Sequence, residues 1–302
     1  MKRLFVTLFF TSSFLMAQTS KSVSTPNGEF ALIDEGRGTP VLLLHGFPDS
    51  KRLWQHQIPA LVEAGYRVIA PDLRGYGDSP RPKEKEQYAM PLLMGDVIGV
   101  LDALELEQVH LVGHDWGAAL SWTLARYFGH RFLSLTALSV GSLGNSGWDS
   151  LEQRQKSWYF YLFLQEGLAE KTLADNDWQF AREFMASHPM AETLIEGFQK
   201  EGRLTTGLNW YRANMQDLIA RPDVDYSPEN NPTPPAITEL ELPVMGVWSD
   251  GDLFLTESQM QRSSEHAADF TYKRLEGAGH WMMLDQPDAF TTILLEFLKN
   301  QP

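Results

Sequence analysis

The chain of 302 residues contains no cysteine. Without a thiol it has no disulfide bond, no cysteine nucleophile, no thiolate zinc site and no cysteine-ligated iron–sulfur cluster. Basic residues are also few, because 25 Lys and Arg stand against 39 Asp and Glu and give a net charge of −14. A field of that sign repels phosphate backbones and anionic lipid surfaces, so nucleic acid is not an expected partner.

Long apolar runs are missing beyond residue 17, where no stretch of 18 or more apolar residues, no repeat and no low-complexity tract occurs. The composition, 43% hydrophobic and 21% charged, is typical of a globular protein with a sizeable core.

The first residues form a separate pattern. Lys2 and Arg3 precede a short apolar and hydroxylated run, Leu4 to Met16, which Ala17 follows. This arrangement is typical of a secretory signal, and the run is too short for a comfortable bilayer span of roughly 20 residues. We therefore expect residues 1–17 to be a signal peptide, with a buried first helix as the alternative. The mature protein would then be periplasmic or secreted in a bacterium and would not be membrane-bound.

Short apolar runs alternate with helical patterns along the rest of the chain. We expect strands at Glu29–Asp34, Val41–Leu44, Arg67–Ala70, Val109–Val112, Leu135–Val140 and Val244–Trp248. We expect helices at Trp54–Ala64, Met90–Leu104, Ala118–Phe128, Glu257–His266 and Pro287–Leu298. Such alternation predicts an α/β fold with a mostly parallel sheet that helices cover on both faces.

The alternation breaks once, over residues 142–241, where aromatic and acidic residues recur at helical spacing. We interpret this segment as a helical cap inserted into a core of residues 24–141 and 242–302. Four prolines, Pro228, Pro232, Pro234 and Pro235, predict a non-helical return to the sheet. An insert over the carboxyl ends of strands would form a wall of a substrate pocket; the alternative is a second packing layer without a functional role.

The segment Gly113-His114-Asp115-Trp116-Gly117 follows a predicted strand and opens a helix. It fits the nucleophile-elbow pattern, with Asp where lipases have Ser. Glycines allow the sharp turn because side chains there would collide with the neighbouring strand and helix. The amino end of the helix would stabilise the negative charge of Asp115. The alternative is a helix-capping Asp between coincidental glycines.

Two further loops follow strands. His45-Gly46-Phe47-Pro48 stands where hydrolases with such an elbow take one oxyanion-hole N–H, so the backbone amides of Phe47 and Trp116 are the natural pair. The glycine-rich loop from Asp72 to Ser79 lacks a following Lys-Ser/Thr and opens no helix. We interpret that loop as scaffold and not as a phosphate cradle.

A histidine and two acids complete a possible triad. His280 precedes the last helix, and Asp250 and Asp252 follow the strand Val244–Trp248. The chain order is therefore nucleophile, acid, histidine, as in hydrolases with the elbow.

Four motifs together resemble a known family. In chain order they are His45 to Pro48, Asp72 to Ser79, Gly113 to Gly117, and Gly279-His280-Trp281. They resemble the epoxide hydrolases of the α/β-hydrolase fold and the related haloalkane dehalogenases, from about residue 29 to residue 298. The resemblance implies an α/β-hydrolase fold with a helical cap and an aspartate nucleophile. It favours Asp252 over Asp250 as the triad acid.

The cap contains two segments, Gly207 to Arg212 and Ser157-Trp158-Tyr159, that resemble those presenting paired tyrosines to the epoxide oxygen in epoxide hydrolases. Tyr211 matches directly. For the first tyrosine the register leaves Tyr159 and Tyr161, which point to nearly opposite sides of a helix. We choose Tyr159.

The resemblance implies a reaction in two steps. Asp115 would attack an epoxide carbon while the two phenols protonate the ring oxygen. Water activated by His280, which Asp252 orients, would then hydrolyse the ester, and the amides of Phe47 and Trp116 would hold the oxyanion. The expected partners are a small apolar epoxide and water, and neither metal nor organic cofactor is required. The sequence carries no signal for an oligomeric state.

Two alternatives stay open. The resemblance implies that a haloalkane or haloacid dehalogenase would need Trp116 plus either an Asn or a second Trp as halide donors, and Phe47 stands where that Asn would be. A second indole could come from Trp148, Trp158 or Trp178. A binding protein that has lost catalysis is the remote alternative, against which the complete set of catalytic residue types argues.

Overall fold

The computed structural model describes residues 20–142, 150–215 and 239–301. Within them, the strands form one eight-stranded sheet in the order β1-β2-β4-β3-β5-β6-β7-β8. The strands are β1 (Ser20–Thr25), β2 (Gly28–Gly36), β3 (Pro40–Leu44), β4 (Arg67–Pro71), β5 (Val109–His114), β6 (Phe132–Leu138), β7 (Val244–Gly251) and β8 (Phe270–Gly279). β1 pairs antiparallel with β2, and β2 with β4, while all other neighbours are parallel. The expected, mostly parallel sheet is confirmed.

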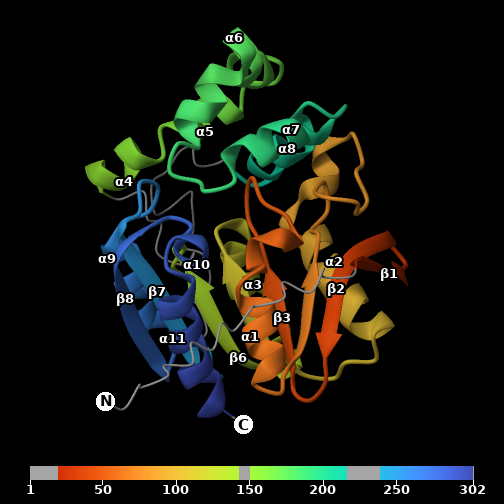
Figure 1. Ribbon diagram of the computed structural model, residues 1–302, viewed down its shortest axis with the longest axis vertical. Helices are drawn as coiled ribbons and strands as arrows, with labels where there is room; N and C mark the ends of the chain where they lie inside the picture. The colour runs from red at the N-terminus through yellow and green to blue at the C-terminus, as the bar shows by residue number, and fades with distance from the viewer. Residues whose placement is uncertain (1–19, 143–149, 216–238, 302) are drawn as a thin grey trace, which may run out of the picture.

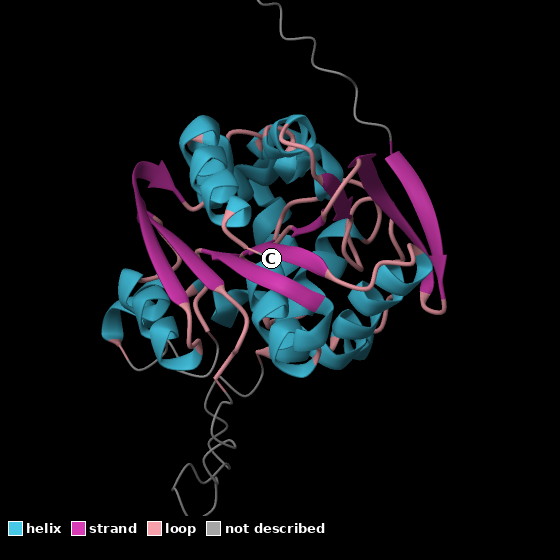
Figure 2. Ribbon diagram, turned by 90° about the horizontal axis from the view of Figure 1, so that it is seen from below, coloured by secondary structure: helices cyan, strands magenta, loops and turns pink. Residues whose placement is uncertain are grey.

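Helices lie on both faces of this sheet (Figure 2). The core helices are α1 (Gln57–Glu63), α2 (Met90–Ala103), α3 (Trp116–Tyr127), α9 (Glu257–Gln261), α10 (Met282–Asp285) and α11 (Pro287–Lys299). α1 contacts α11, and α2 contacts α3. The central strands require this cover because the apolar run Val41–Leu44 of β3 is completely buried.

Residues 150–215, between β6 and β7 in the chain, form a helical cap at the top of Figure 1. Its described helices are α4 (Leu151–Lys156), α5 (Tyr159–Phe163), α6 (Leu168–Phe184), α7 (Ala191–Phe198) and α8 (Arg203–Asn214). Helical geometry breaks inside α6 at Asp175–Trp178. The four prolines of the predicted return path, Trp148 and the predicted signal peptide 1–17 lie outside the described residues.

Several element bounds differ from the expectations. The sheet begins at Ser20 and not near residue 24, and β8 was not predicted. β1 and β8 are the edge strands of the sheet, and their side chains are mostly exposed or half-exposed. Neither strand therefore has the apolar run that would have predicted it. The predicted helix Trp54–Ala64 is a 3₁₀ turn, Lys51–Trp54, followed by α1, and α9 continues as a 3₁₀ turn at Arg262–His266. β6 starts three residues earlier than predicted and ends at Leu138. Across the described ranges, none of the helices has the length and apolar character needed to cross a bilayer.

Candidate active site

Asp115 sits in a tight turn between β5 and α3 with φ 52° and ψ −120°. A side chain at either flanking glycine would collide with backbone. A Cβ on Gly113 would lie 2.4 Å from the carbonyl oxygen of Gly117, and one on Gly117 would lie 2.2 Å from that of Leu44. The two glycines therefore allow the strained turn that holds Asp115 at the end of the strand.

The two carboxylate oxygens of Asp115 have different surroundings. Oδ1 accepts a hydrogen bond from the backbone N–H of Phe47 at 2.8 Å. A Cβ on Gly46 would lie 2.3 Å from the same oxygen, so glycine is required for this approach. Oδ2 lies 3.7 Å from Nε2 of His280. The N–H of Trp116, the second predicted oxyanion donor, belongs to the first residue of α3, directly after Asp115.

His280 lies between β8 and α10 and is buried. Its Nδ1 contacts Oδ2 of Asp252 at 2.9 Å. The other oxygen of Asp252 accepts the N–H groups of Phe254 and Leu255 at 2.8 and 3.0 Å. Asp250 instead accepts the N–H of Gly277 at the surface. The structure thus brings Asp115, His280 and Asp252 together and leaves Asp250 outside.

Burial alone would lower the pKa of the His280 imidazole, but the neighbouring carboxylates Asp252 and Asp115 raise this pKa to about 10. Burial would raise the pKa of Asp252, yet His280 and the two backbone N–H groups hold it below its usual value. At neutral pH the pair is therefore an imidazolium beside an ionised Asp252.

Two cap tyrosines face this triad. Tyr159 of α5 and Tyr211 of α8 are 4% and 2% exposed, and their ring centroids are 6.0 Å apart. The ring of Trp116 also packs against that of Tyr211, with centroids 5.1 Å apart. Burial raises the pKa of both phenols well above the usual range, and the charge of Asp115 adds to the effect. Both therefore stay protonated. Tyr161 is 50% exposed on the other side of α5.

Aromatic side chains surround the triad and the tyrosines. The ring of Phe254 lies 4.9 Å from His280 and 5.5 Å from Tyr159, between centroids. The others that contact Tyr159 or Tyr211 include Phe47, Phe160, Phe163 and Phe184. The indoles considered as halide donors lie elsewhere: Trp158 is half exposed and Trp178 stacks on Phe198.

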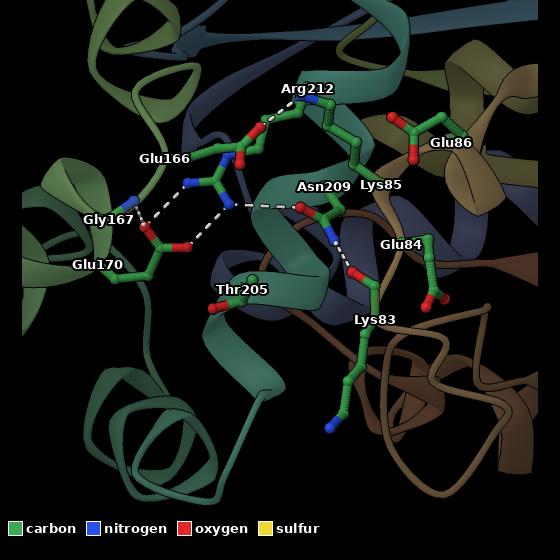
Figure 3. A pocket seen from close by; sticks show the side chains of 10 residues that line it. All are labelled: Lys83, Glu84, Lys85, Glu86, Glu166, Gly167, Glu170, Thr205, Asn209 and Arg212. Carbon is green, nitrogen blue, oxygen red and sulfur yellow. Dashed lines mark hydrogen bonds and ion pairs between the residues drawn. The ribbon is translucent and has the colours of Figure 1, made fainter.

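A hollow of about 410 Å³ lies between the cap and the segment 83–86 (Figure 3). Its lining is ionic, and no member of the triad contributes to it. Arg212, which lines the hollow, makes a bidentate ion pair with Glu170 at 2.8 and 2.9 Å. Its Nε also donates a hydrogen bond to the carbonyl of Phe163. This hollow is unlike an apolar substrate pocket. Among the described residues, no three His, Asp or Glu side chains are grouped to hold a metal ion.

Sequence reasoning missed several polar residues around the site. His114 lies behind His280, with its Nε2 3.0 Å from the His280 carbonyl oxygen, and burial lowers its pKa to about 4. Asp49 and His188 form a second buried pair. His114 stands inside one quoted motif and Asp49 directly follows another, but no local pattern connects either of them to a residue so distant in the chain.

Known proteins with a similar sequence or a similar fold include epoxide hydrolases. The family described as alpha/beta hydrolase fold matches residues 39–287. Epoxide hydrolase A of Mycobacterium tuberculosis is 29% identical over 326 residues, which cover 93% of this chain and 98% of that protein. A solved structure described among novel epoxide hydrolases from metagenomes of hot environments is 28% identical, with a TM-score of 0.82 over 94% of this chain and 99% of its own. Epoxide hydrolase A from Mycobacterium thermoresistibile is also 28% identical, with a TM-score of 0.75 over 94% and 99%.

Proposed function

Because the chain belongs to the alpha/beta hydrolase fold family, we propose that it is an epoxide hydrolase that opens epoxides to vicinal diols through a covalent ester on Asp115. One observation carries the proposal: two buried, protonated phenols, Tyr159 and Tyr211, lie beside each other and close enough to the carboxylate of Asp115 for its charge to raise their pKa. Ester hydrolases need no such phenol pair, whereas the opening of an epoxide releases an alkoxide that must be protonated.

In the first step Oδ2 of Asp115 attacks an epoxide carbon, because Oδ1 is held by the Phe47 N–H. A carbon–oxygen bond to Asp115 forms and the ring carbon–oxygen bond breaks. The phenols of Tyr159 and Tyr211 hold the ring oxygen, and one of them transfers its proton to the alkoxide. Their raised pKa keeps both protonated before the substrate binds.

Ester formation prepares His280 for the second step. The carboxylate of Asp115 helps to raise the pKa of His280 to about 10, and this charge disappears when the ester forms. The pKa of His280 must then fall, so Nε2 can give up its proton, which restores the phenol that protonated the alkoxide, and can act as a base. Asp252 stays ionised at Nδ1 and orients the ring.

In the second step His280 takes a proton from a water molecule, which attacks the acyl carbon of Asp115. The Oδ1 atom, at 2.8 Å from the Phe47 N–H, becomes the oxyanion, and the N–H of Trp116 is the second donor that we assign to it. The bond between the acyl carbon and the substrate oxygen then breaks. The departing alkoxide takes up the second proton of the attacking water, and His280 is left as the imidazolium with which the cycle began. The diol leaves, and Asp115 is a carboxylate again with one oxygen from water.

The aromatic surroundings support an apolar substrate. Phe163, Phe184 and Phe254 surround the phenols, and none of them offers a hydrogen bond from its side chain. A lipophilic or aryl-substituted epoxide, with water as the second reactant, fits this lining. The chain's net charge of −14 argues against a nucleic-acid partner.

Incubation with styrene oxide and, separately, with 1-bromobutane tests the activity. We expect styrene glycol from the first and no bromide from the second. Bromide release without diol formation would favour the dehalogenase alternative, and neither product would favour a binding protein.

We further propose that residues 1–17 are a signal peptide and that the mature protein is exported to the periplasm or secreted. The charged start and the short apolar run support this proposal. Amino-terminal sequencing of the protein from a periplasmic extract should return a start near Gln18, whereas a start at Met1 would contradict export.

A further inference from the structure

Asp49, a buried carboxylate without a role in the proposed reaction, joins three separate segments of the chain. Its Oδ1 accepts a hydrogen bond from Nε2 of His188 at 3.0 Å, and its Oδ2 accepts one from Nε1 of Trp281, also at 3.0 Å. His188 belongs to the segment 185–190 between α6 and α7, so this bond connects the cap to the core. All three residues are almost completely buried.

The protonation of His188 follows from its two ring nitrogens. The backbone N–H of Met190 donates to Nδ1 at 2.9 Å, so Nδ1 carries no hydrogen and Nε2 is the donor to Asp49. Burial would raise the pKa of Asp49, but its contact with His188 holds this pKa below the usual value. The Nε2–H of His188 and the ionised carboxylate of Asp49 therefore meet in one fixed orientation.

On one side, Asp49 closes the turn that contains the oxyanion donor. Its own N–H donates to the carbonyl of Gly46 at 3.0 Å. Phe47, between these two residues, directs its N–H to Asp115. The anchored carboxylate of Asp49 therefore restricts the orientation of the Phe47 N–H.

On the other side, Asp49 holds the residue that follows the catalytic histidine. The ring of Trp281 lies 5.1 Å from that of His280, and the ring of His188 lies 4.4 Å from the same indole. With its N–H bound to Asp49 and its ring packed edge-on against that of His188, the indole has little freedom to turn. The backbone that joins His280 to Trp281 is restrained together with the indole.

We propose that Asp49 and His188 are positioning residues for ester hydrolysis. Docking of the cap through His188 holds the two loops that supply the oxyanion N–H and the imidazole. This inference rests on the two-step reaction proposed above. Attack on the epoxide uses Asp115 and the two phenols, and none of these three side chains is hydrogen-bonded to the Asp49–His188 pair. Loss of the pair should therefore slow the second step selectively.

Three variants separate positioning from simple packing. His188→Met fills space but cannot donate to Asp49, whereas the carboxamide N–H of His188→Gln reaches about as far as Nε2. Asp49→Asn sets an NH₂ group against one of the two N–H donors. As a matched control, Trp122→Phe removes another buried indole hydrogen bond, from Trp122 to the carbonyl of Val140 at 3.0 Å, away from this network.

Rapid mixing with styrene oxide should resolve ester formation from ester hydrolysis. We expect His188→Met and Asp49→Asn to hydrolyse the ester at least about 10-fold more slowly than the wild type. The rate of ester formation should change about twofold at most. Both kcat and KM should then fall together. His188→Gln should recover most of the hydrolysis rate, and Trp122→Phe should resemble the wild type.

Two results would overturn the proposal. Unchanged ester hydrolysis in both His188→Met and Asp49→Asn would show that the network positions nothing, while leaving the two-step reaction intact. If ester hydrolysis were slowed equally in His188→Met and His188→Gln, the effect would come from the packing of the imidazole and not from its hydrogen bond. Absence of an ester in the wild type would instead contradict the proposed function itself, and the positioning role with it.

Discussion

Asp115 and His280 face each other across 3.7 Å, measured from Oδ2 to Nε2. This distance is longer than a normal hydrogen bond, so Oδ2 is not engaged as firmly as Oδ1, which the Phe47 N–H holds at 2.8 Å. One oxygen is thus available to a substrate, and the histidine stands beside the bond that must later be hydrolysed. The same arrangement serves nucleophile and base in succession.

Replacement of His280 by Gln should separate the two steps. Ester formation needs the carboxylate and the phenols, whereas ester hydrolysis needs the base. Intact-mass spectrometry after epoxide addition should show the protein heavier by one substrate mass, on the peptide that contains Asp115. An unmodified variant that still turns over would exclude this role of His280.

Substitution of either buried tyrosine by Phe should slow ester formation. Tyr211→Phe and Tyr159→Phe each remove one donor to the developing alkoxide, and we expect a loss of about 10²-fold or more by analogy with single oxyanion donors. Tyr161→Phe is the matched control, because Tyr161 is half exposed on the opposite side of the same helix. Stopped-flow measurement of ester formation distinguishes the three, and a sensitive Tyr161 with a silent Tyr159 would reject our assignment.

Arg212 should influence ester formation without contacting the substrate. It follows Tyr211 on α8 and donates to the carbonyl of Phe163, the last residue of the helix that carries Tyr159. Arg212→Gln should therefore loosen the spacing of the two phenols and slow ester formation about tenfold, with little effect on ester hydrolysis. Arg67→Gln is the control, because it breaks the bidentate ion pair between Arg67 and Asp34. It should leave both ester formation and ester hydrolysis unchanged. Equal effects of the two variants would argue against a link between α8 and α5.

Stability should depend on pH through His280. Its pKa is raised from 6.5 in the unfolded chain to about 10 in the folded protein, so it binds a proton more tightly when folded. The resulting stabilisation is complete below the unfolded pKa and is lost as the pH rises through the folded one. Urea unfolding at about pH 6 and about pH 10.5 gives the free energy of unfolding of the wild type and of His280→Gln. The amount by which the wild type exceeds the variant should shrink at the higher pH. An advantage that grows with pH would contradict the raised pKa.

Sequence patterns predicted the central strands because those are buried on both faces and appear as short apolar runs, as in Val41–Leu44. The edge strands β1 and β8 escaped prediction. β8 contains Lys273, Arg274 and Glu276, which are exposed, and it obtains its strand conformation from pairing with β7. Such pairing is a tertiary effect that local propensity does not contain.

In the candidate site, too, the features that depend on local sequence could be predicted, and those that depend on contacts between distant residues could not. The turn around Asp115 could be predicted because its glycines follow from local backbone geometry. His188 could not, since it lies 139 residues from Asp49 and its own surroundings contain no motif. The register of α5, which buries Tyr159 and exposes Tyr161, depends on how the cap packs over the core.

The origin of one oxygen atom tests the covalent mechanism most directly. Water that attacks the acyl carbon leaves its oxygen on Asp115, and the diol departs with an oxygen that belonged to the carboxylate. With enzyme in excess in ¹⁸O water, mass spectrometry should find the first-turnover diol nearly unlabelled and the Asp115 peptide labelled. A fully labelled first-turnover diol with an unlabelled Asp115 peptide would mean that water opens the epoxide directly, and it would contradict the ester on Asp115.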